Sequence, residues 1–212
     1  MSKKTTPNSK GFTIIELMIA TVVFGTVLLV VTIAVLQFTR VYYRGVTEAN
    51  TQDTARTIVD NISQAIQFNG GNVTDTAASP SPGTSYAFCT GNQQYSYTTG
   101  LQLADAPTSM QTYHAVVVRD AAGCTSSSPS PQNMRGASVT GREMLSPKMR
   151  LARMQVTNVP GTKLYKISVR VVYGDDDLLV GPNTATAKCS GQAGSQFCAV
   201  SDITTVVAKR VE

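Results

Sequence analysis

Hydrophobic and polar positions divide the chain into regions, and the first region is the most uniform. From Phe12 to Phe38 the side chains are almost all apolar, and Glu16 carries the only formal charge. A helix of this length extends about 40 Å, more than the roughly 30 Å hydrocarbon core of a bilayer. The run is also longer than the apolar region of a secretory signal, and no A-x-A-like cleavage site follows it. These features predict a membrane helix that remains in the mature protein.

A second pattern follows at residues 39–68. Apolar side chains recur there at spacings of three and four, the period of one helical face, at Ala55, Ile58, Val59, Ile62 and Ile66. Gly70 and Gly71 then supply a helix stop signal. We therefore expect a single helix from Thr13 to about Phe68, roughly 84 Å long. Its first half would lie in the membrane, and its amphipathic second half would pack on a head domain.

The remainder, residues 69–212, has the pattern of a β-rich head. Residues 165–173 alternate apolar and polar positions most clearly, the period of a half-buried strand. The candidate strands are Tyr86–Cys89, Tyr95–Thr98, Tyr113–Arg119, Leu151–Val156, Tyr165–Tyr173 and Ile203–Val211. Their short spacing, without helix-length crossovers, favours antiparallel pairing. The predicted fold class is therefore α+β, a long N-terminal helix packed on an antiparallel sheet.

Glu16 is the unusual residue of the apolar run. Thr13-Ile14-Ile15-Glu16 fits the capping box, in which Thr13 and Glu16 satisfy free amides at a helix start. A charge within a membrane helix is nevertheless costly, and it suggests a functional role. Cleavage after Gly11 would create an amine on Phe12, about one helical turn from Glu16. In a bundle of identical helices, that amine could neutralise the carboxylate of a neighbour, so both interpretations stay open.

A known family has the same arrangement of residues. The stretch Lys10-Gly11-Phe12-Thr13-Ile14-Ile15-Glu16-Leu17, after a basic leader and before an apolar helix, resembles the N-terminal signature of type IV prepilins and type II secretion pseudopilins. The resemblance covers about the first forty residues. It implies that a membrane peptidase cleaves between Gly11 and Phe12 and methylates the Phe12 amine. It also implies that Glu16 guides each subunit into register in a helical filament.

This resemblance leads to a specific expectation for organisation and location. Residues 1–11 would be the leader, 12–38 the transmembrane half of the helix, 39–68 its amphipathic half, and 69–212 the extracytoplasmic head. Lys3, Lys4 and Lys10 favour a cytoplasmic N-terminus. The implied partners are other pilin or pseudopilin subunits, the prepilin peptidase, and membrane lipid before assembly. The long head with irregular loops favours a minor subunit, of either a pilus or a secretion pseudopilus, and a plain single-pass anchor is the competing interpretation.

The four cysteines all lie in the predicted head. No C-x-x-C occurs, and their spacing does not suggest a zinc site. Disulfides are the usual state of cysteines outside the cytoplasm. Cys189 and Cys198 bracket a short flexible loop, which leaves Cys89 and Cys124 as the second pair, although four cysteines allow three connectivities. Free buried cysteines are the other possibility.

Positive charge is concentrated in residues 119–170. The mature chain would have 15 basic and 13 acidic side chains, a net charge of +2, whereas this segment has nine basic and two acidic ones. Such a segment could form a nucleic-acid-binding face, with candidate contacts at Arg135, Arg142, Lys148, Arg150 and Arg153. The alternative function is therefore a DNA-binding or adhesive minor pilin. The same charges could instead dock on acidic neighbours or be scattered over several faces.

Catalytic and metal chemistry have little support in the sequence. The only histidine, His114, falls in a candidate strand and is interpreted as a residue of one strand face. There is no Gly-rich phosphate loop and no histidine-based metal motif. Asp175, Asp176 and Asp177 could ligate calcium, but adjacent aspartates usually form a solvated turn. We therefore expect a non-enzymatic chain without a cofactor or metal.

Overall fold

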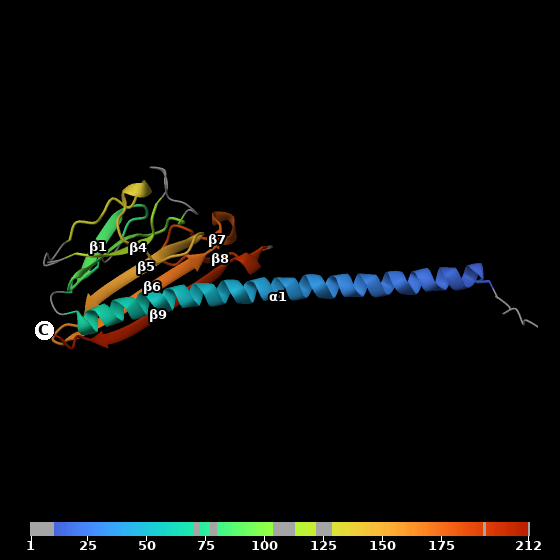
Figure 1. Ribbon diagram of the computed structural model, residues 1–212, viewed down its shortest axis with the longest axis horizontal. Coiled ribbons are helices and arrows are strands. Elements are labelled where there is room, and N and C mark those ends of the chain that lie inside the picture. Colours follow the sequence, from blue (N-terminus) through green and yellow to red (C-terminus); the bar gives the residue numbers. More distant parts are fainter. Residues whose placement is uncertain are drawn as a thin grey trace, which may run out of the picture. The chain divides into compact units, whose positions relative to one another are not determined.

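The computed structural model describes residues 11–69, 73–76, 80–103, 113–121, 129–192 and 194–211 (Figure 1). One helix, α1, spans Ile14–Phe68. The strands are β1 (Ser85–Thr90), β2 (Gln93–Thr98), β3 (Val116–Asp120), β4 (Arg142–Glu143), β5 (Met149–Asn158), β6 (Leu164–Tyr173), β7 (Leu179–Val180), β8 (Lys188–Cys189) and β9 (Ala199–Ala208). The chain divides into two units, one ending at Tyr42 and the other beginning at Tyr43.

The first unit contains the apolar part of α1. Every side chain from Phe12 to Tyr42 is exposed within the chain, and the helix is long and apolar enough to cross a membrane. Its threonines would bring unsatisfied hydroxyls into lipid, which is costly. Each hydroxyl instead donates to a backbone carbonyl three or four residues earlier, at Thr21, Thr26, Thr32 and Thr39. The helix thus satisfies these polar groups internally.

The second unit begins with the amphipathic part of α1. The five apolar residues that the sequence places on one face are each no more than 4% exposed, so the predicted face is confirmed. Ala65 and the Thr51 side chain are buried on it as well. The Tyr95 hydroxyl of β2 donates to Asn61 Oδ1 at 2.7 Å and links the sheet to the helix. Burial raises the pKa of this tyrosine.

The head contains antiparallel sheets, as the strand spacing predicts. One has the order β1-β2-β3-β4, a second has the order β5-β6-β9, and β7 pairs with β8. Figure 1 shows β5, β6 and β9 running beside the C-terminal part of α1. Residues 100–103 follow the outer edge of β5, where Gly100 N–H donates to Leu151 O and Leu103 N–H donates to Met149 O. This segment covers the free edge of β5 and joins it to the chain after β2.

The main core lies where α1 meets both larger sheets. Alternate residues of β6 enter it, namely Tyr165, Ile167, Val169 and Val171. Phe88 and Tyr95 stack in it with ring centroids 4.8 Å apart. A smaller cluster on the opposite face of β6 contains Ala152, Val172, Leu179, Ala187 and Cys198. The segment with β7 and β8 therefore covers the second face of β6 with its own apolar contacts.

Two strands have a boundary that differs by three or more residues from the sequence prediction. The predicted strand Tyr113–Arg119 begins only at Val116, because Tyr113 forms an isolated bridge with Arg135. The predicted strand Ile203–Val211 begins earlier, at Ala199, and ends at Ala208. Residues 199–202 have no clear alternation, but they pair with the end of β6, Ser201 opposite Val171 and Asp202 opposite Arg170. Pairing with a formed neighbour extends a strand that periodicity does not reveal.

One disulfide connects β8 with the residue before β9. It joins Cys189 and Cys198, the two cysteines for which the sequence predicts a pair. Cys89 is buried and is also disulfide-bonded. Cys124 lies outside the described residues, so its pairing with Cys89 remains a prediction.

Removal of the Cys189–Cys198 disulfide should destabilise the head. The bond closes a loop with a sequence separation of 9, so the double variant Cys189→Ala/Cys198→Ala should lose about 2–3 kcal/mol of unfolding free energy.

Peptide mapping without reductant should show Cys189 joined to Cys198 and Cys89 joined to Cys124. A Cys189–Cys89 peptide would show that our connectivity is wrong.

Candidate functional site

The start of α1 contains the predicted processing and assembly residues. Gly11, Phe12 and Thr13 precede the helix and are exposed. The Glu16 carboxylate folds back, and its Oε2 accepts hydrogen bonds from Thr13 N–H at 2.9 Å and from the Thr13 hydroxyl at 2.8 Å. Glu16 N–H donates to Thr13 Oγ1 at 3.3 Å. These contacts form the capping box.

The capping box does not neutralise the charge of Glu16. Its two donors are both neutral groups of Thr13. Within the described part of the chain, no basic side chain lies within ion-pair distance of Glu16. The surrounding side chains are apolar and exposed, with Phe12 at 85% and Leu17 at 61%. Among the described residues the Glu16 carboxylate therefore has no cationic partner, and it is directed toward the N-terminal end of an apolar helix.

Gly11 has open space around it. A Cβ atom added there would meet no atom within 4 Å. The fold of this chain therefore does not require glycine at position 11. Any requirement for glycine there would come from another molecule.

The predicted basic face is not one accessible surface. Arg150 is 1% exposed and pairs with Asp176, while its Nη2 donates to Gly174 O at 3.1 Å, so its prediction as a nucleic-acid contact is wrong. The segment after β6 encloses the Arg150 guanidinium, since Nη1 donates to Pro182 O at 3.5 Å and Nη2 to Gly174 O. Arg153 donates to both carboxylate oxygens of Asp202, at 2.6 and 2.8 Å. Buried or paired guanidinium groups are poorly placed to contact phosphates.

The remaining candidates are exposed but come from different parts of the head. The Arg135 guanidinium lies over the Tyr113 ring, 4.6 Å from its centroid. Arg142 lies on β4 of the first sheet, and Lys148 lies before β5 of the second. The positive charge of residues 119–170 is thus distributed over both sheets, and this arrangement does not support the DNA-binding alternative.

The acidic turn is bound to basic residues. Lys148 Nζ lies 3.9 Å from Asp175 Oδ2, and Arg150 pairs with Asp176. Gln102 Nε2 donates to Asp175 Oδ1 at 3.0 Å. The described residues contain no group of three or more possible metal-ligating His, Cys, Asp or Glu side chains. Two of the three carboxylates, those of Asp175 and Asp176, thus link the turn to residues at the start of β5.

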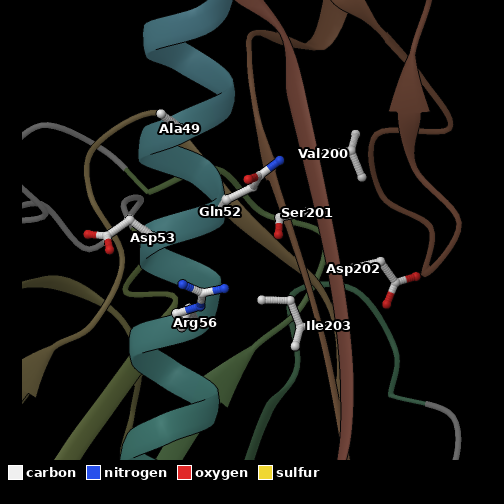
Figure 2. A pocket seen from close by; sticks show the side chains of 8 residues that line it. All are labelled: Ala49, Gln52, Asp53, Arg56, Val200, Ser201, Asp202 and Ile203. Carbon is white, nitrogen blue, oxygen red and sulfur yellow. The ribbon is translucent and has the colours of Figure 1, made fainter.

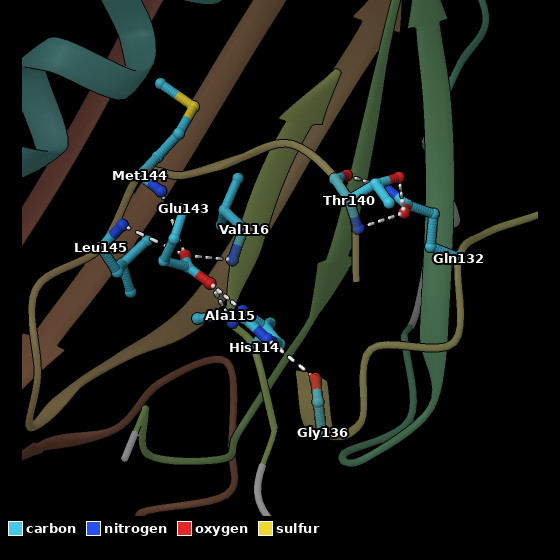
Figure 3. Close-up of polar contacts among 9 residues, drawn as sticks. All are labelled: His114, Ala115, Val116, Gln132, Gly136, Thr140, Glu143, Met144 and Leu145. Carbon is cyan, nitrogen blue, oxygen red and sulfur yellow. Dashed lines mark hydrogen bonds and ion pairs between the residues drawn. The ribbon is translucent and has the colours of Figure 1, made fainter. Parts of the chain in front are cut away.

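One polar cluster was not found by sequence reasoning. Glu143 accepts hydrogen bonds from the backbone N–H groups of Ala115, Val116, Met144 and Leu145, at 2.9 to 3.2 Å (Figure 3). His114 Nδ1 lies 3.1 Å from Glu143 Oε2, and its Nε2 lies 3.2 Å from Gly136 O. His114 lies before β3, so the sequence prediction that places it within a strand is wrong. No spacing rule links a glutamate to amides almost thirty residues earlier.

This cluster has a structural role, and its charge should matter for stability. Glu143→Gln should lower unfolding free energy by about 2 kcal/mol, because the new NH₂ group would face amide donors. In detergent, thermal unfolding followed by circular dichroism should show a melting temperature about 4–8 °C lower. Glu48→Gln is the control, since Glu48 pairs only at the surface with Arg44, at 2.9 Å, and such pairs contribute little. Equal melting temperatures for the two variants would contradict the role of the Glu143 charge.

An open groove lies between α1 and β9 within the second unit. It has a volume of about 610 Å³ and is lined by α1 residues including Gln52 and Arg56, and by residues 200–203 of β9. Figure 2 shows the Gln52 side chain extending from α1 toward β9. The Asp202 carboxylate forms ion pairs with Arg153 and Arg170. The groove has no arrangement of a nucleophile beside a base among its lining residues.

Comparison with known proteins agrees with the N-terminal site. Residues 6–32 match the family model described as the prokaryotic N-terminal methylation motif. The chain therefore carries a type IV prepilin-like signal, and its long helix packed with antiparallel sheets has a pilin-like α+β fold. No curated protein and no solved structure matches the chain. The family match covers only the N-terminal motif, and the motif favours a membrane-anchored structural protein of the pilin type.

Proposed function

We propose that this chain is a minor pilin or pseudopilin, a subunit of a type IV pilus or a type II secretion filament. Residues 1–11 form a leader that the prepilin peptidase removes after Gly11, and the same enzyme methylates the Phe12 amine. Residues 12–38 hold the subunit in the cytoplasmic membrane, with the N-terminus inside and the head, residues 69–212, outside. The subunit then assembles through α1 with other pilin or pseudopilin subunits.

The observation that carries this proposal is the Glu16 carboxylate beside Phe12, for which the described part of the chain supplies no cationic partner. The capping box directs the carboxylate toward the N-terminal end of α1, where its hydrogen-bond donors among the described residues belong to Thr13. Cleavage after Gly11 would add a cation next to Thr13. In a neighbouring helix shifted along its axis by about one turn, the Phe12 amine would lie level with Glu16 of this chain. Neutralisation of this pair would then favour a bundle in which the subunits are staggered.

A plain membrane anchor needs neither cleavage nor a charged partner. The N-terminal methylation motif at residues 6–32 supports processing over this alternative. The capping box explains how Glu16 begins the helix, but its neutral Thr13 donors leave the negative charge in place, and a charge in lipid is costly. Assembly gives that charge a partner.

Recovery of the processed chain in filaments tests the proposed function. Filaments sheared from cells, or crosslinked in place, should contain a form that begins at Phe12. Cells without the peptidase should retain the uncleaved form in the membrane and none in filaments. A chain that is processed but always absent from filaments would contradict the assembly role.

A further inference from the structure

β9 is the outer strand of the second sheet, and no described residue pairs with its outer edge. The sheet has the order β5-β6-β9, and within the described residues β9 pairs with β6 alone. The other long outer strands are covered. Residues 100–103 follow the edge of β5, and Thr74 N–H donates to Cys89 O at 3.0 Å beside β1. β9 therefore presents a bare edge that is ten residues long.

The sequence of β9 lacks the features that usually protect such an edge. Edge strands are commonly protected by proline, by lysine, by a β-bulge or by short length. Residues 199–208, AVSDITTVVA, contain no proline and no lysine, and their register with β6 is continuous. Their only charge, that of Asp202, is already paired with two arginines. Valine, isoleucine and threonine dominate the strand, so it is suited to pairing on both sides.

The register determines which backbone groups of β9 face outward. Lys209 N–H donates to Lys163 O at 3.0 Å, just beyond the pair formed by Ala208 and Leu164. In an antiparallel pair, directly opposite residues alternate between hydrogen-bonded and non-hydrogen-bonded positions. The odd-numbered residues of β9 therefore bond to β6. The even-numbered residues, from 200 to 208, direct their N–H and C=O groups outward.

A groove lies beside the same edge. Figure 2 shows Ser201 and Ile203 on the α1 side of β9, and Val200 and Asp202 on the opposite side. The groove of about 610 Å³ between α1 and β9 borders the first of these sides. A strand placed along β9 would direct every second side chain into it. An outer strand beside a helix-lined groove is an arrangement that binds extended peptides, in which backbone hydrogen bonds give affinity and the groove gives specificity.

Basic side chains border the edge on the sheet face that points away from α1. Asp202 lies on that face, and directly opposite residues share a face. Arg170 lies opposite Asp202, and Arg153 lies opposite Arg170. Lys166, opposite Val206, is exposed and forms no ion pair with a described residue. Three basic side chains thus stand against one acidic side chain, so this face favours an acidic partner.

We propose that the outer edge of β9 binds an extended acidic segment of a partner protein as an added strand. The acidic side chains of that segment lie at alternate positions, on the face away from α1, and the intervening side chains enter the groove. The site lies wholly within the second unit. Binding therefore requires neither membrane anchoring nor cleavage after Gly11.

Site-resolved hydrogen exchange of the full chain in detergent micelles tests the added strand. The probe is the peptide acetyl-Thr-Glu-Thr-Glu-Thr-Glu-Thr-Glu-amide, and the same peptide with lysine in place of glutamate is its charge-reversed control. Without peptide, the outward amides of Asp202, Thr204 and Val206 should exchange faster than the inward amides of Ile203 and Thr205. A saturating concentration of the glutamate peptide should slow the outward amides by about 10-fold or more and leave the inward ones unchanged. The lysine peptide should have little effect.

Three variants test the backbone and the charge separately. Thr204→Pro removes one outward N–H and should abolish the protection, because proline cannot donate to an added strand. Thr204→Val is its matched control: both variants lose the hydroxyl that donates to Ser168 Oγ at 3.0 Å, but valine keeps the N–H and should bind as the wild-type chain does. Lys166→Glu keeps the whole of β9 and should weaken binding of the glutamate peptide. Circular dichroism verifies that each variant is folded.

Each outcome decides for or against the proposal. Alternating protection by the glutamate peptide, lost in Thr204→Pro and weakened in Lys166→Glu, supports it. Equal protection by both peptides would show that the partner is not selected by negative charge, and no protection by either would show that β9 does not accept a strand. Outward amides that are protected without peptide would mean that the edge is already covered, by a second copy of this chain if dilution removes the protection. Any of these three results overturns the proposal and leaves the filament role untouched.

Discussion

Glu16→Gln should lower the amount of this chain in filaments by about 100-fold or more, because loss of one partner of a buried ion pair costs about 3–5 kcal/mol. Glutamine keeps an oxygen that can accept the two Thr13 hydrogen bonds, so the helix start should survive. It cannot neutralise an amine from a neighbouring subunit. Cleavage and membrane insertion should therefore be normal. The measurement compares processed chain in sheared or crosslinked filaments with processed chain in membranes.

Thr13→Val is the matched control for the Glu16 charge. It removes the hydroxyl that donates to Glu16 Oε2 at 2.8 Å and accepts from Glu16 N–H, but it keeps the carboxylate. Loss of an N-cap side chain costs about 0.5–2 kcal/mol. We therefore expect a much smaller loss of incorporation than for Glu16→Gln.

The order of the two effects decides between the interpretations of Glu16. If Thr13→Val reduces incorporation and Glu16→Gln does not, the capping box suffices and the assembly role is wrong. A subunit at a filament tip has neighbours on one side only and would tolerate Glu16→Gln. Crosslinks from the Phe12 end identify that position, because a tip subunit would crosslink to neighbours on a single side.

Gly11→Val should abolish processing, so that the uncleaved chain accumulates in the membrane. A valine side chain meets nothing within this chain, since a Cβ at position 11 has no atom within 4 Å. A loss of cleavage would therefore arise in the peptidase site, where a branched side chain does not fit a pocket that selects glycine. Intact-mass measurement of the wild-type membrane form should show a chain that begins at N-methyl-Phe12, and the variant should begin at Met1.

Gly25→Val is the control for this substitution. Gly25 also has no neighbouring atom within 4 Å of an added Cβ, but it lies within the membrane segment of α1. This variant should be cleaved normally. If Gly11→Val is cleaved as well as Gly25→Val, glycine is not selected at position 11. A Met1 start of the wild-type chain in cells that have the peptidase would contradict the pilin-like interpretation altogether.

The helix could be predicted almost completely from the sequence. Its observed bounds, Ile14–Phe68, differ by one residue from the predicted start and match the predicted end. Its start depends on contacts three residues apart, and its buried face depends on spacings of three and four. Such signals are local, so the pattern of residues contains them in full.

The two-residue strands and the burial of individual charged side chains could not be predicted in this way. β4, β7 and β8 each have two residues and exist only because a partner pairs with them. Arg150 looks like its basic neighbours in the sequence, yet it is 1% exposed, whereas Arg142 is exposed. Burial of a charge depends on which segments cover it, and those segments are distant in the chain.

The sequence by itself determined the apolar helix, its capping box, the glycine before Phe12, and the β-rich character of the head. Each follows from composition or from contacts within a few residues. Only the tertiary structure decided that Asp202 forms ion pairs with Arg153 and Arg170. The same holds for the hydrogen bonds that Glu143 accepts from the Ala115 and Val116 amides, and for the contact between Phe197 and Tyr43. These contacts join residues far apart in sequence, because packing of the sheets and of α1 brings them together, and no periodicity along the chain records which distant residues will meet.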